Sequence, residues 1–351
     1  MNAYIVTYCT PSSVGSILQS LGLKRALSKL EINSAVLQLG DRKTYSLCAP
    51  KTVKELYHFP AKCIRHREFV SGFDKCCGFM DKYLDFERFK SYDDLSEECL
   101  SNGVFIAGSD QIWNPAIGIN RLKFFFLEFC KDNKKISYAA SMGKENIPQE
   151  LEESYRSWLD GFDYVSVRES EAKRSLEPLT NKKIEINPDP VFFLTAEEWC
   201  AYEQPYPVKG KYILVYAIHW DKKLNVSLRR LHRQTGLQII AIKNVPSTVY
   251  CNKACCDVGP AEFLWLIDHA EYVVSSSFHG IAFSAVFHKK FSAVINPIAP
   301  SRINCLLNIF DLPEVKIDEL TTCDAFNYGE VELKFSQERE RSMDYLRNSL
   351  L

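Results

Sequence analysis

The stretch "VFIAGSDQIWNP", residues 104–115, decides how the chain is expected to fold, because an apolar run leads directly into polar side chains. Residues 104–107 have the composition of a buried strand, and Asn114 and Pro115 indicate a turn. In a parallel sheet, polar residues at the end of a strand face the ligand. Helix caps favour the same residue types, so a cap and a binding site both remain open.

Outward from this stretch, strand and helix patterns alternate along the chain. Residues 3–9 are predicted as a strand and residues 17–27 as a helix, and the pattern restarts at residue 212 after a linker rich in proline. We therefore expect an α/β fold of two Rossmann-like domains that face a cleft. The expected divisions are an N-terminal domain on the acceptor side (residues 1–206, with a helical insertion around residues 50–95), a C-terminal domain on the donor side (residues 207–330) and a last helix that packs back on the first domain (residues 331–351).

Within this alternation, several elements have well-marked limits. Helices are predicted at residues 149–160 and 221–235, and strands at residues 212–216 and 237–242.

Composition argues against several classes of protein. The formal net charge is −1 without a block of Lys and Arg, which disfavours a nucleic-acid-binding protein. The 13 cysteines are odd in number and several are adjacent, so cytosolic thiols are expected rather than disulfides. The start of the chain lacks a basic signal-peptide segment, and no apolar run is long enough to span a membrane. We expect a cytoplasmic protein that binds small molecules or sugars.

The polar residues of the opening stretch have the chemistry of a sugar site. Gly108 allows a close approach of the backbone. Ser109, Asp110 and Gln111 offer a hydroxyl, a carboxylate and an amide. Trp113 offers an apolar face of the kind that packs on a sugar ring.

A second stretch, "SSSFHGIAFSAVF" at residues 275–287, places serines at the end of a predicted strand and a histidine at the start of a helix. Backbone N–H groups at a helix start, together with the hydroxyls of Ser276 and Ser277, form an anion site. His279, followed by Gly280, can transfer a proton near neutral pH. A structural role for this histidine remains equally open.

Two arginines also have positions that suit ligand binding. Arg168 ends the predicted strand "YVSVR", and Arg302 lies where a helix is expected to begin. A guanidinium there can bind a carboxylate or phosphate through two hydrogen bonds, although solvated surface arginine is the alternative. Asp189 lies between two prolines, and we favour a structural role in the turn for its side chain.

Taken together, these stretches resemble the polysaccharide pyruvyl transferases. The motifs that carry the resemblance occur in the same order as in the family, from about residue 4 to residue 312. It is carried by "SSVGSILQSLGLKRAL", "VFIAGSDQIWNP", "FFFLEF", "KKISYAASMG", "VSVRESEAKRSLE", "INPDPVFFL", "YVVSSSFHGIAFSAVF" and "SRINCLLNIF". Two positions depart from the pattern. Many members have Asn-Tyr-Gly where this chain has Ser13-Val14-Gly15, and many have Arg where it has Ser277.

The resemblance implies a GT-B-like fold and an enzyme that transfers the pyruvyl skeleton of phosphoenolpyruvate to a hexose as a ketal. It implies His279 as the acid, Arg168 and Arg302 as contacts for the donor's charges, and Asp110 as the group that holds or deprotonates the attacking hydroxyl. We expect the opening stretch to face the sugar. We expect the second half of the chain to supply the acid and to bind the charged groups of the donor. The implied substrate-binding set also contains Gly15, Ser16, Gly108, Ser109, Gln111, Trp113, Ser276, Ser277 and Gly280.

The implied reaction uses phosphoenolpyruvate as donor substrate and requires no cofactor and no metal. The expected product is a 4,6-ketal on galactose in a capsular or exopolysaccharide precursor, which is either a free sugar or an oligosaccharide linked to polyprenyl diphosphate. A lipid-linked acceptor would bring the protein to the inner face of the membrane, although no basic amphipathic patch is clear in the sequence. A GT-B nucleotide-sugar glycosyltransferase and a non-catalytic carbohydrate-binding assembly protein remain alternatives.

Overall fold

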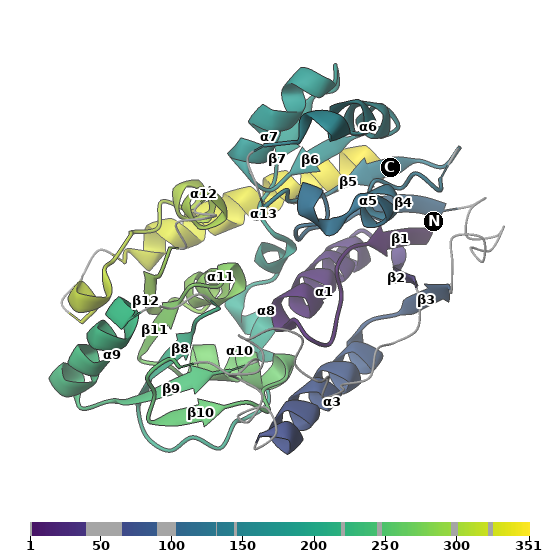
Figure 1. Cartoon of the computed structure of the whole chain (residues 1–351). Coiled ribbons are helices and arrows are strands. Elements are labelled where there is room, and N and C mark those ends of the chain that lie inside the picture. Colours follow the sequence, from purple (N-terminus) through teal and green to yellow (C-terminus); the bar gives the residue numbers. More distant parts are fainter. Residues whose placement is uncertain are drawn as a thin grey trace.

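The structure, a computed structural model, describes residues 2–39, 65–89, 103–130, 132–143, 146–218, 222–243, 248–295, 301–321 and 326–351. Two five-stranded sheets each form the centre of one α/β domain (Figure 1). All strand pairs within them are parallel, as expected for a chain in which strands and helices alternate. The predicted fold class is confirmed.

The N-terminal sheet has the strand order β3-β2-β1-β4-β5. The order reverses between β1 and β4, and a crevice opens at such a reversal beyond the carboxyl ends of the strands. A short parallel pair, β6 and β7, continues from β5 through isolated bridges. The strands are β1 (Asn2–Val6), β2 (Asn33–Leu39), β3 (Phe86–Phe89), β4 (Gly103–Ala107), β5 (Lys135–Ser137), β6 (Val165–Val167) and β7 (Ile184–Ile186).

The C-terminal sheet repeats this strand order as β10-β9-β8-β11-β12. Its reversal lies between β8 and β11, so each domain contributes one crevice. The short edge strand β10 has no counterpart among the predicted elements, because its three residues are defined by backbone pairing with β9. The strands are β8 (Tyr212–Tyr216), β9 (Gln238–Ile242), β10 (Lys253–Cys255), β11 (Tyr272–Ser275) and β12 (Lys290–Ala293).

Helices flank both sheets. In the N-terminal domain they are α1 (Val14–Lys29), α3 (His66–Tyr83), α5 (Ile119–Phe125), α6 (Gln149–Asp160), α7 (Ser170–Leu176) and α8 (Ala196–Cys200). In the C-terminal domain they are α9 (Lys222–Thr235), α10 (Pro260–Asp268), α11 (Phe278–Val286) and α12 (Ser301–Ile309), and α13 (Tyr328–Leu350) ends the chain. Short 3₁₀ turns are η1 (Pro115–Ile117), η2 (Glu177–Leu179), η3 (Pro190–Phe193) and η4 (Ile317–Glu319).

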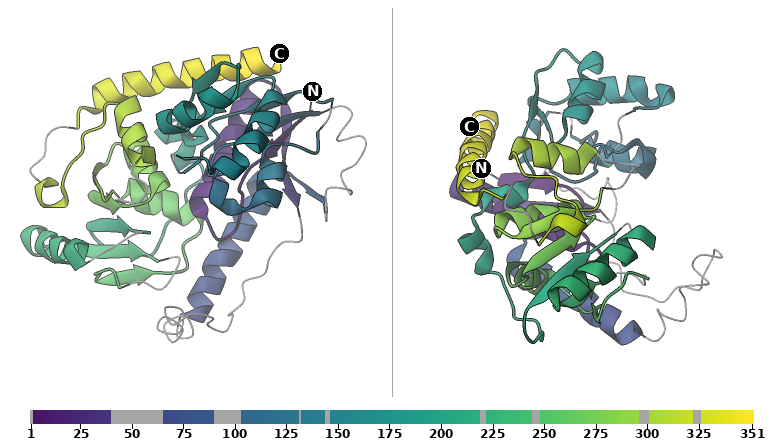
Figure 2. Two further views of the ribbon diagram at one scale, coloured as in Figure 1. Left: turned by 45° about the horizontal axis from the view of Figure 1, so that its top comes forward. Right: turned by 90° about the vertical axis from the view of Figure 1, so that its left-hand side faces the viewer.

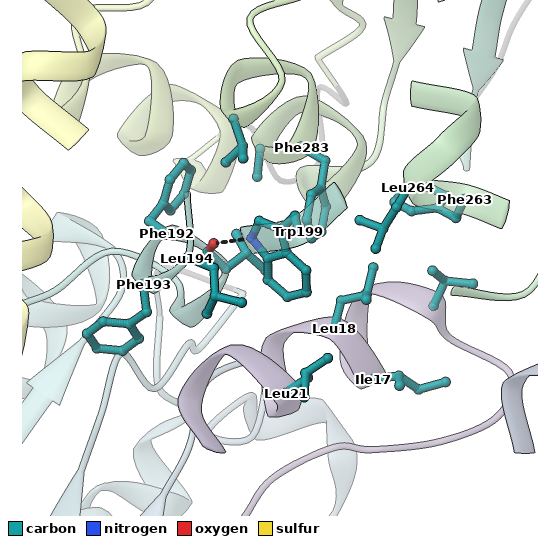
Figure 3. Close-up of a cluster of buried hydrophobic side chains, with 14 of the residues drawn as sticks. Ile17, Leu18, Leu21, Phe192, Phe193, Leu194, Trp199, Phe263, Leu264 and Phe283 are labelled. Carbon is teal, nitrogen blue, oxygen red and sulfur yellow. Dashed lines mark hydrogen bonds between the residues drawn. The ribbon is translucent and has the colours of Figure 1, made fainter. Parts of the chain in front are cut away.

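A buried apolar cluster joins the two domains (Figure 3). At its centre Trp199 is fully buried and donates from Nε1 to the carbonyl oxygen of Val191 at 2.9 Å. Most of α1 is buried, because this helix is apolar on more than one face and contacts η3 and α10 as well as its own sheet. The labelled members of the cluster are Ile17, Leu18, Leu21, Phe192, Phe193, Leu194, Trp199, Phe263, Leu264 and Phe283.

The last helix, α13, runs across both domains (Figures 1 and 2). Near its end, the hydroxyl of Tyr345 donates to the carbonyl oxygen of Ser137 in the N-terminal domain at 2.8 Å. At its start, the hydroxyl of Tyr328 donates to the carbonyl oxygen of Lys289 in the C-terminal domain. Among the described helices, none combines the length and apolar character that crossing a membrane requires.

The predicted helical insertion is only partly described. Its residues 50–64 and 90–95 lie outside the described residues. The remainder contains α3, but residues 86–89 form the edge strand β3 instead of helix. Pairing of β3 with β2 fixes this strand, and the spacing of aromatic residues in the sequence gives no sign of that pairing.

Candidate active site

A pocket of about 280 Å³ lies between the domains, at the carboxyl ends of β1, β4, β8 and β11. This volume is just below the roughly 300–1,000 Å³ of pockets for drug-sized ligands, so it suits a small molecule. A hollow of about 540 Å³ lies at the amino ends of β1 and β2, the edge where such sheets do not bind ligands. The interdomain pocket is lined by Ser13, Gly15, Asp110 and Gln111 from the first domain and by Tyr216, Ile218, Ser276, Ser277, Phe278, His279, Arg302 and Ile303 from the second.

The turn between β11 and α11 positions His279. The hydroxyl of Ser275 donates to the carbonyl oxygen of Tyr216 at 2.8 Å and accepts from the N–H of Ser277 at 3.1 Å. The imidazole is 12% exposed and packs against Gly15, where a Cβ atom would lie 2.2 Å from Nδ1. A glycine on α1 of the N-terminal domain therefore makes room for the histidine of the C-terminal domain.

The surroundings of His279 favour its neutral form. Its Nε2 atom lies 3.7 Å from Oδ2 of Asp189, which is too far for a hydrogen bond. Burial lowers the pKa of His279, and the carboxylates of Asp189 and Asp110 only partly oppose this effect. The cations Arg168 and Arg302 lower the pKa further. The imidazole is therefore mainly uncharged near neutral pH.

Arg168 is the centre of a buried ion-pair network. Its side chain is 3% exposed and donates from Nη1 to Asp189 at 2.6 Å and from Nε to Glu169 at 3.2 Å. The guanidinium carbon lies 4.2 Å from the centre of the Phe278 ring, and Glu169 also accepts from the hydroxyl of Ser141 at 2.5 Å. Although burial acts in the opposite direction, the two carboxylates raise the pKa of Arg168. This network connects the end of β6 to the start of α11.

Arg302, near the start of α12, lies against Gln111 of the opposite domain. With its amide oxygen turned toward the guanidinium, Gln111 accepts from Nη1 at 2.8 Å and from Nη2 at 3.1 Å. Gly143 has a φ of +64° and leaves space for this side chain, since a Cβ there would lie 2.3 Å from the end of Gln111. Burial and the nearby Arg168 lower the pKa of Arg302, which still remains a cation at neutral pH.

Several buried polar atoms around the pocket have no hydrogen-bond partner among the described residues. They are Nε2 of His279, Nε of Arg302, Nη2 of Arg168 and Oε2 of Glu169. Buried polar atoms in proteins are nearly always bonded, so the three nitrogens indicate a place for a ligand or water. The first N–H groups of α11 also lack a side-chain cap from Ser277, and such N–H groups attract anions. The arrangement is suited to an anionic ligand.

Asp110 lines the pocket from the N-terminal domain. Its φ of +77° turns the chain sharply at the end of β4, a conformation that Asp tolerates better than most residues. Oδ1 accepts from the N–H of Gln111 at 2.7 Å, and the carbonyl oxygen accepts from the N–H of Ser141 at 3.0 Å. The half-buried carboxylate is therefore held in the pocket wall, where it can accept a proton or a hydrogen bond from a hydroxyl.

Five of the predicted site residues lie behind the pocket wall, and one of them is Arg168, whose guanidinium is held by the buried ion pairs described above. Ser109 donates to Asp189 at 3.0 Å. Ser16 accepts from the N–H of Thr10 at 3.2 Å. Gly108 packs against Thr7, and Gly280 packs against Ser275. The predicted residues that do line the pocket are Gly15, Asp110, Gln111, Ser276, Ser277, His279 and Arg302.

Two sequence-based expectations need correction. Trp113 does not face the cleft: it is fully buried, and its ring stacks on Phe126 with ring centres 4.6 Å apart. Its Nε1 atom donates to the carbonyl oxygen of Phe125, so its polar atom is satisfied inside the aromatic core of the domain. Arg168 belongs to the N-terminal domain, so the two arginines approach the site from opposite domains and not both from the second half of the chain.

Sequence reasoning missed the importance of two carboxylates. Asp189 caps η3 by accepting from the N–H of Val191 at 3.2 Å, but its second oxygen also holds Arg168, so its role is more than structural. Glu169 was not singled out, although an acidic residue directly after Arg168 at a strand end could have signalled an ion pair.

The residues that the structure describes also contain a group of potential metal ligands outside the pocket. Cys200, Glu203 and Asp268 bring three ligand atoms within 4.8 Å of one another. Asp268 already pairs with Lys289 at 3.3 Å, which competes with a cation.

Comparisons with known proteins identify a matching family and a similar fold. The sequence model of a family described as polysaccharide pyruvyl transferase matches residues 14–296. A putative UDP-N-acetylglucosamine 2-epimerase from Listeria monocytogenes is similar in structure, with 11% identity, a TM-score of 0.51 and coverage of 97% of this chain and 90% of that chain. S. aureus MnaA, solved with UDP, has 12% identity, a TM-score of 0.50 and coverage of 100% and 97%. No curated protein matches the chain. At such identities the structural likeness shows the GT-B fold alone.

Proposed function

The chain belongs to the polysaccharide pyruvyl transferase family, and from that premise we propose that it transfers the pyruvyl skeleton of phosphoenolpyruvate to a hexose and releases phosphate. The proposed acceptor is galactose in a capsular or exopolysaccharide precursor, free or linked to polyprenyl diphosphate, and the proposed product is its 4,6-ketal. No cofactor or metal enters this scheme. The observation that supports it most directly is the group of unpartnered nitrogens beside the uncapped start of α11.

The donor's charges match the groups that lack partners. Phosphoenolpyruvate carries a carboxylate and a phosphate, which need cations or N–H donors around them. Arg302 has no carboxylate partner among the described residues, and its free Nε atom is buried at the pocket. The N–H groups at the start of α11 provide a second contact. Arg168, whose charge is largely offset by Asp189 and Glu169, contributes its remaining Nη2 atom.

The proposed reaction begins with a proton from His279 to the methylene carbon of the donor, which makes C2 electrophilic. One sugar hydroxyl adds at C2 while Asp110 accepts its proton. A second hydroxyl then replaces the phosphate, so two carbon–oxygen bonds to the sugar form as the carbon–oxygen bond to phosphate breaks. The second hydroxyl proton leaves with the phosphate. A positioned proton donor contributes about 10²–10⁴ in rate.

Donor binding also prepares the acid. Burial lowers the pKa of His279, and the neighbouring Arg168 and Arg302 lower it further. A bound anion offsets the charges of Arg168 and Arg302 and stabilises the imidazolium, so the donor raises the pKa of the group that must protonate it.

The test is incubation of the protein with phosphoenolpyruvate and a panel of galactose-containing acceptors, both free and lipid-linked. We expect phosphate release together with an acceptor that gains the mass of pyruvate less one water. His279→Ala should lose turnover while keeping its melting temperature, which separates catalysis from a purely carbohydrate-binding role. Absence of phosphate release across the whole panel would refute the proposal.

A nucleotide-sugar glycosyltransferase is the second candidate, because the chain shares its fold with a protein solved with UDP. That likeness bears on the fold alone. A thermal shift with UDP and none with phosphoenolpyruvate would favour this alternative.

A further inference from the structure

The helix α9 has two chemically distinct faces. Its apolar residues Leu224, Leu228 and Leu231 are buried against the C-terminal sheet. Its outer face, here called the α9 basic face, is formed by exposed cations, and the helix sequence "KKLNVSLRRLHRQT" contains no Asp or Glu. The residues of the α9 basic face are Lys222, Lys223, Arg229, Arg230 and Arg233.

The cations of the α9 basic face are mostly unpaired. Among the described residues, only Arg230 has a carboxylate partner, Asp318 at 3.0 Å. Arg229 lies over the ring of Tyr250 at 4.2 Å, which holds it in place without neutralising its charge. A helix that is merely solvated usually mixes charges of both signs. In a chain with a net charge of −1, this concentration of one sign indicates an anionic partner.

An exposed apolar side chain lies within the α9 basic face. Val226 is 56% exposed, and it follows Lys222 by one helical turn and precedes Arg229 by another. This combination suits the surface of a membrane. There the cations can bind lipid phosphates, and the apolar side chain can insert among the acyl chains beneath the headgroups.

The position of α9 leaves this face accessible. The helix lies at the outer end of the C-terminal domain, with no other element drawn beyond it (Figures 1 and 2). It begins shortly after Ile218, an exposed residue that lines the pocket.

We propose that the α9 basic face docks the protein on an anionic lipid surface. The α9 basic face lies on the outer side of a single helix. The phosphates of a lipid surface can arrange themselves around such a helix, whereas a folded acidic protein would need a complementary shape. The chain as a whole has a net charge of −1, whereas a nucleic-acid-binding domain is usually basic overall. The proposal concerns lipid binding and does not depend on which donor or acceptor the pocket takes.

The experiment is sedimentation of the whole protein with phosphatidylcholine vesicles, with and without phosphatidylglycerol. We expect binding only when phosphatidylglycerol is present, and weaker binding as salt rises. The test variant is K222Q/K223Q/R233Q. Since each neutralised cation costs about fivefold in affinity, it should bind about a hundredfold more weakly. The control is K173Q/R174Q/K183Q, which removes three cations of the N-terminal domain that each pair with a glutamate and should change binding by less than about threefold.

Melting temperatures of all three proteins show whether the variants remain folded. The proposal is overturned if the wild type does not bind vesicles that contain phosphatidylglycerol, or if both triple variants lose affinity equally. It is also overturned if a DNA duplex binds the wild type more tightly than the vesicles do at the same salt concentration. None of these measurements uses phosphoenolpyruvate, so their failure and the failure of the proposed function can be distinguished.

Discussion

Replacing Gly15 by alanine should displace His279 and suppress catalysis without unfolding the protein. The new Cβ atom would lie 2.2 Å from Nδ1 and 2.4 Å from Cγ of the imidazole, whereas ordinary contact begins near 3.4 Å. The ring must therefore move by more than 1 Å, and a misplacement of about 1 Å can cost on the order of 10² in rate. We expect kcat to fall about a hundredfold in the phosphate-release assay.

This variant should lose at most about 2.5 kcal/mol of stability. Alanine favours the helix by about 0.5–1 kcal/mol relative to glycine, and the new contact costs about 1–3 kcal/mol. The matched control is Gly78→Ala in α3, where the added Cβ would meet nothing within 4 Å. That control should keep full activity and gain about 0.5–1 kcal/mol in urea unfolding. Unchanged kcat in Gly15→Ala would show that His279 does not act from the position seen here.

Two further predictions concern the charges of the site. NMR titrations of the imidazoles can measure the pKa of His279, with its signal assigned from a His279→Gln variant. This pKa should lie below the usual histidine value in the enzyme without donor and should rise when phosphoenolpyruvate binds. A pKa that stays constant or falls on binding would contradict the proposed coupling. Asp189→Asn should destabilise the protein by about 3 kcal/mol in urea unfolding, because it leaves the buried guanidinium of Arg168 with one carboxylate. The control is Asp318→Asn, which breaks the exposed ion pair with Arg230. A loss for Asp189→Asn no larger than that of the control would refute this reasoning.

Much of the fold follows from local pattern. The predicted helix at residues 149–160 and the predicted strand at residues 212–216 coincide with α6 and β8. Apolar periodicity and turn residues determine such elements without help from distant contacts. The strands β3 and β10 escaped prediction because backbone pairing with a neighbouring strand defines them, and their own side chains carry little signal.

The site was predictable where polar residues follow strand ends, as for Asp110, Gln111 and His279. Burial of Trp113 was not predictable, because the turn at the end of β4 decides which way the indole points. The second role of Asp189 depends on its contacts with Ser109 and Arg168. Such contacts between residues distant in sequence cannot be predicted from spacing along the chain.

The contact between Gly15 and His279 means that the position of the proposed acid depends on both domains. One domain supplies the imidazole and the other shapes the space in which it rests, so the orientation of the proton donor reports how the two halves are aligned. A substitution far from the pocket that tilts one domain against the other would thus reach the chemistry directly. The alignment of the two domains would then determine where the proposed proton donor lies relative to the donor substrate.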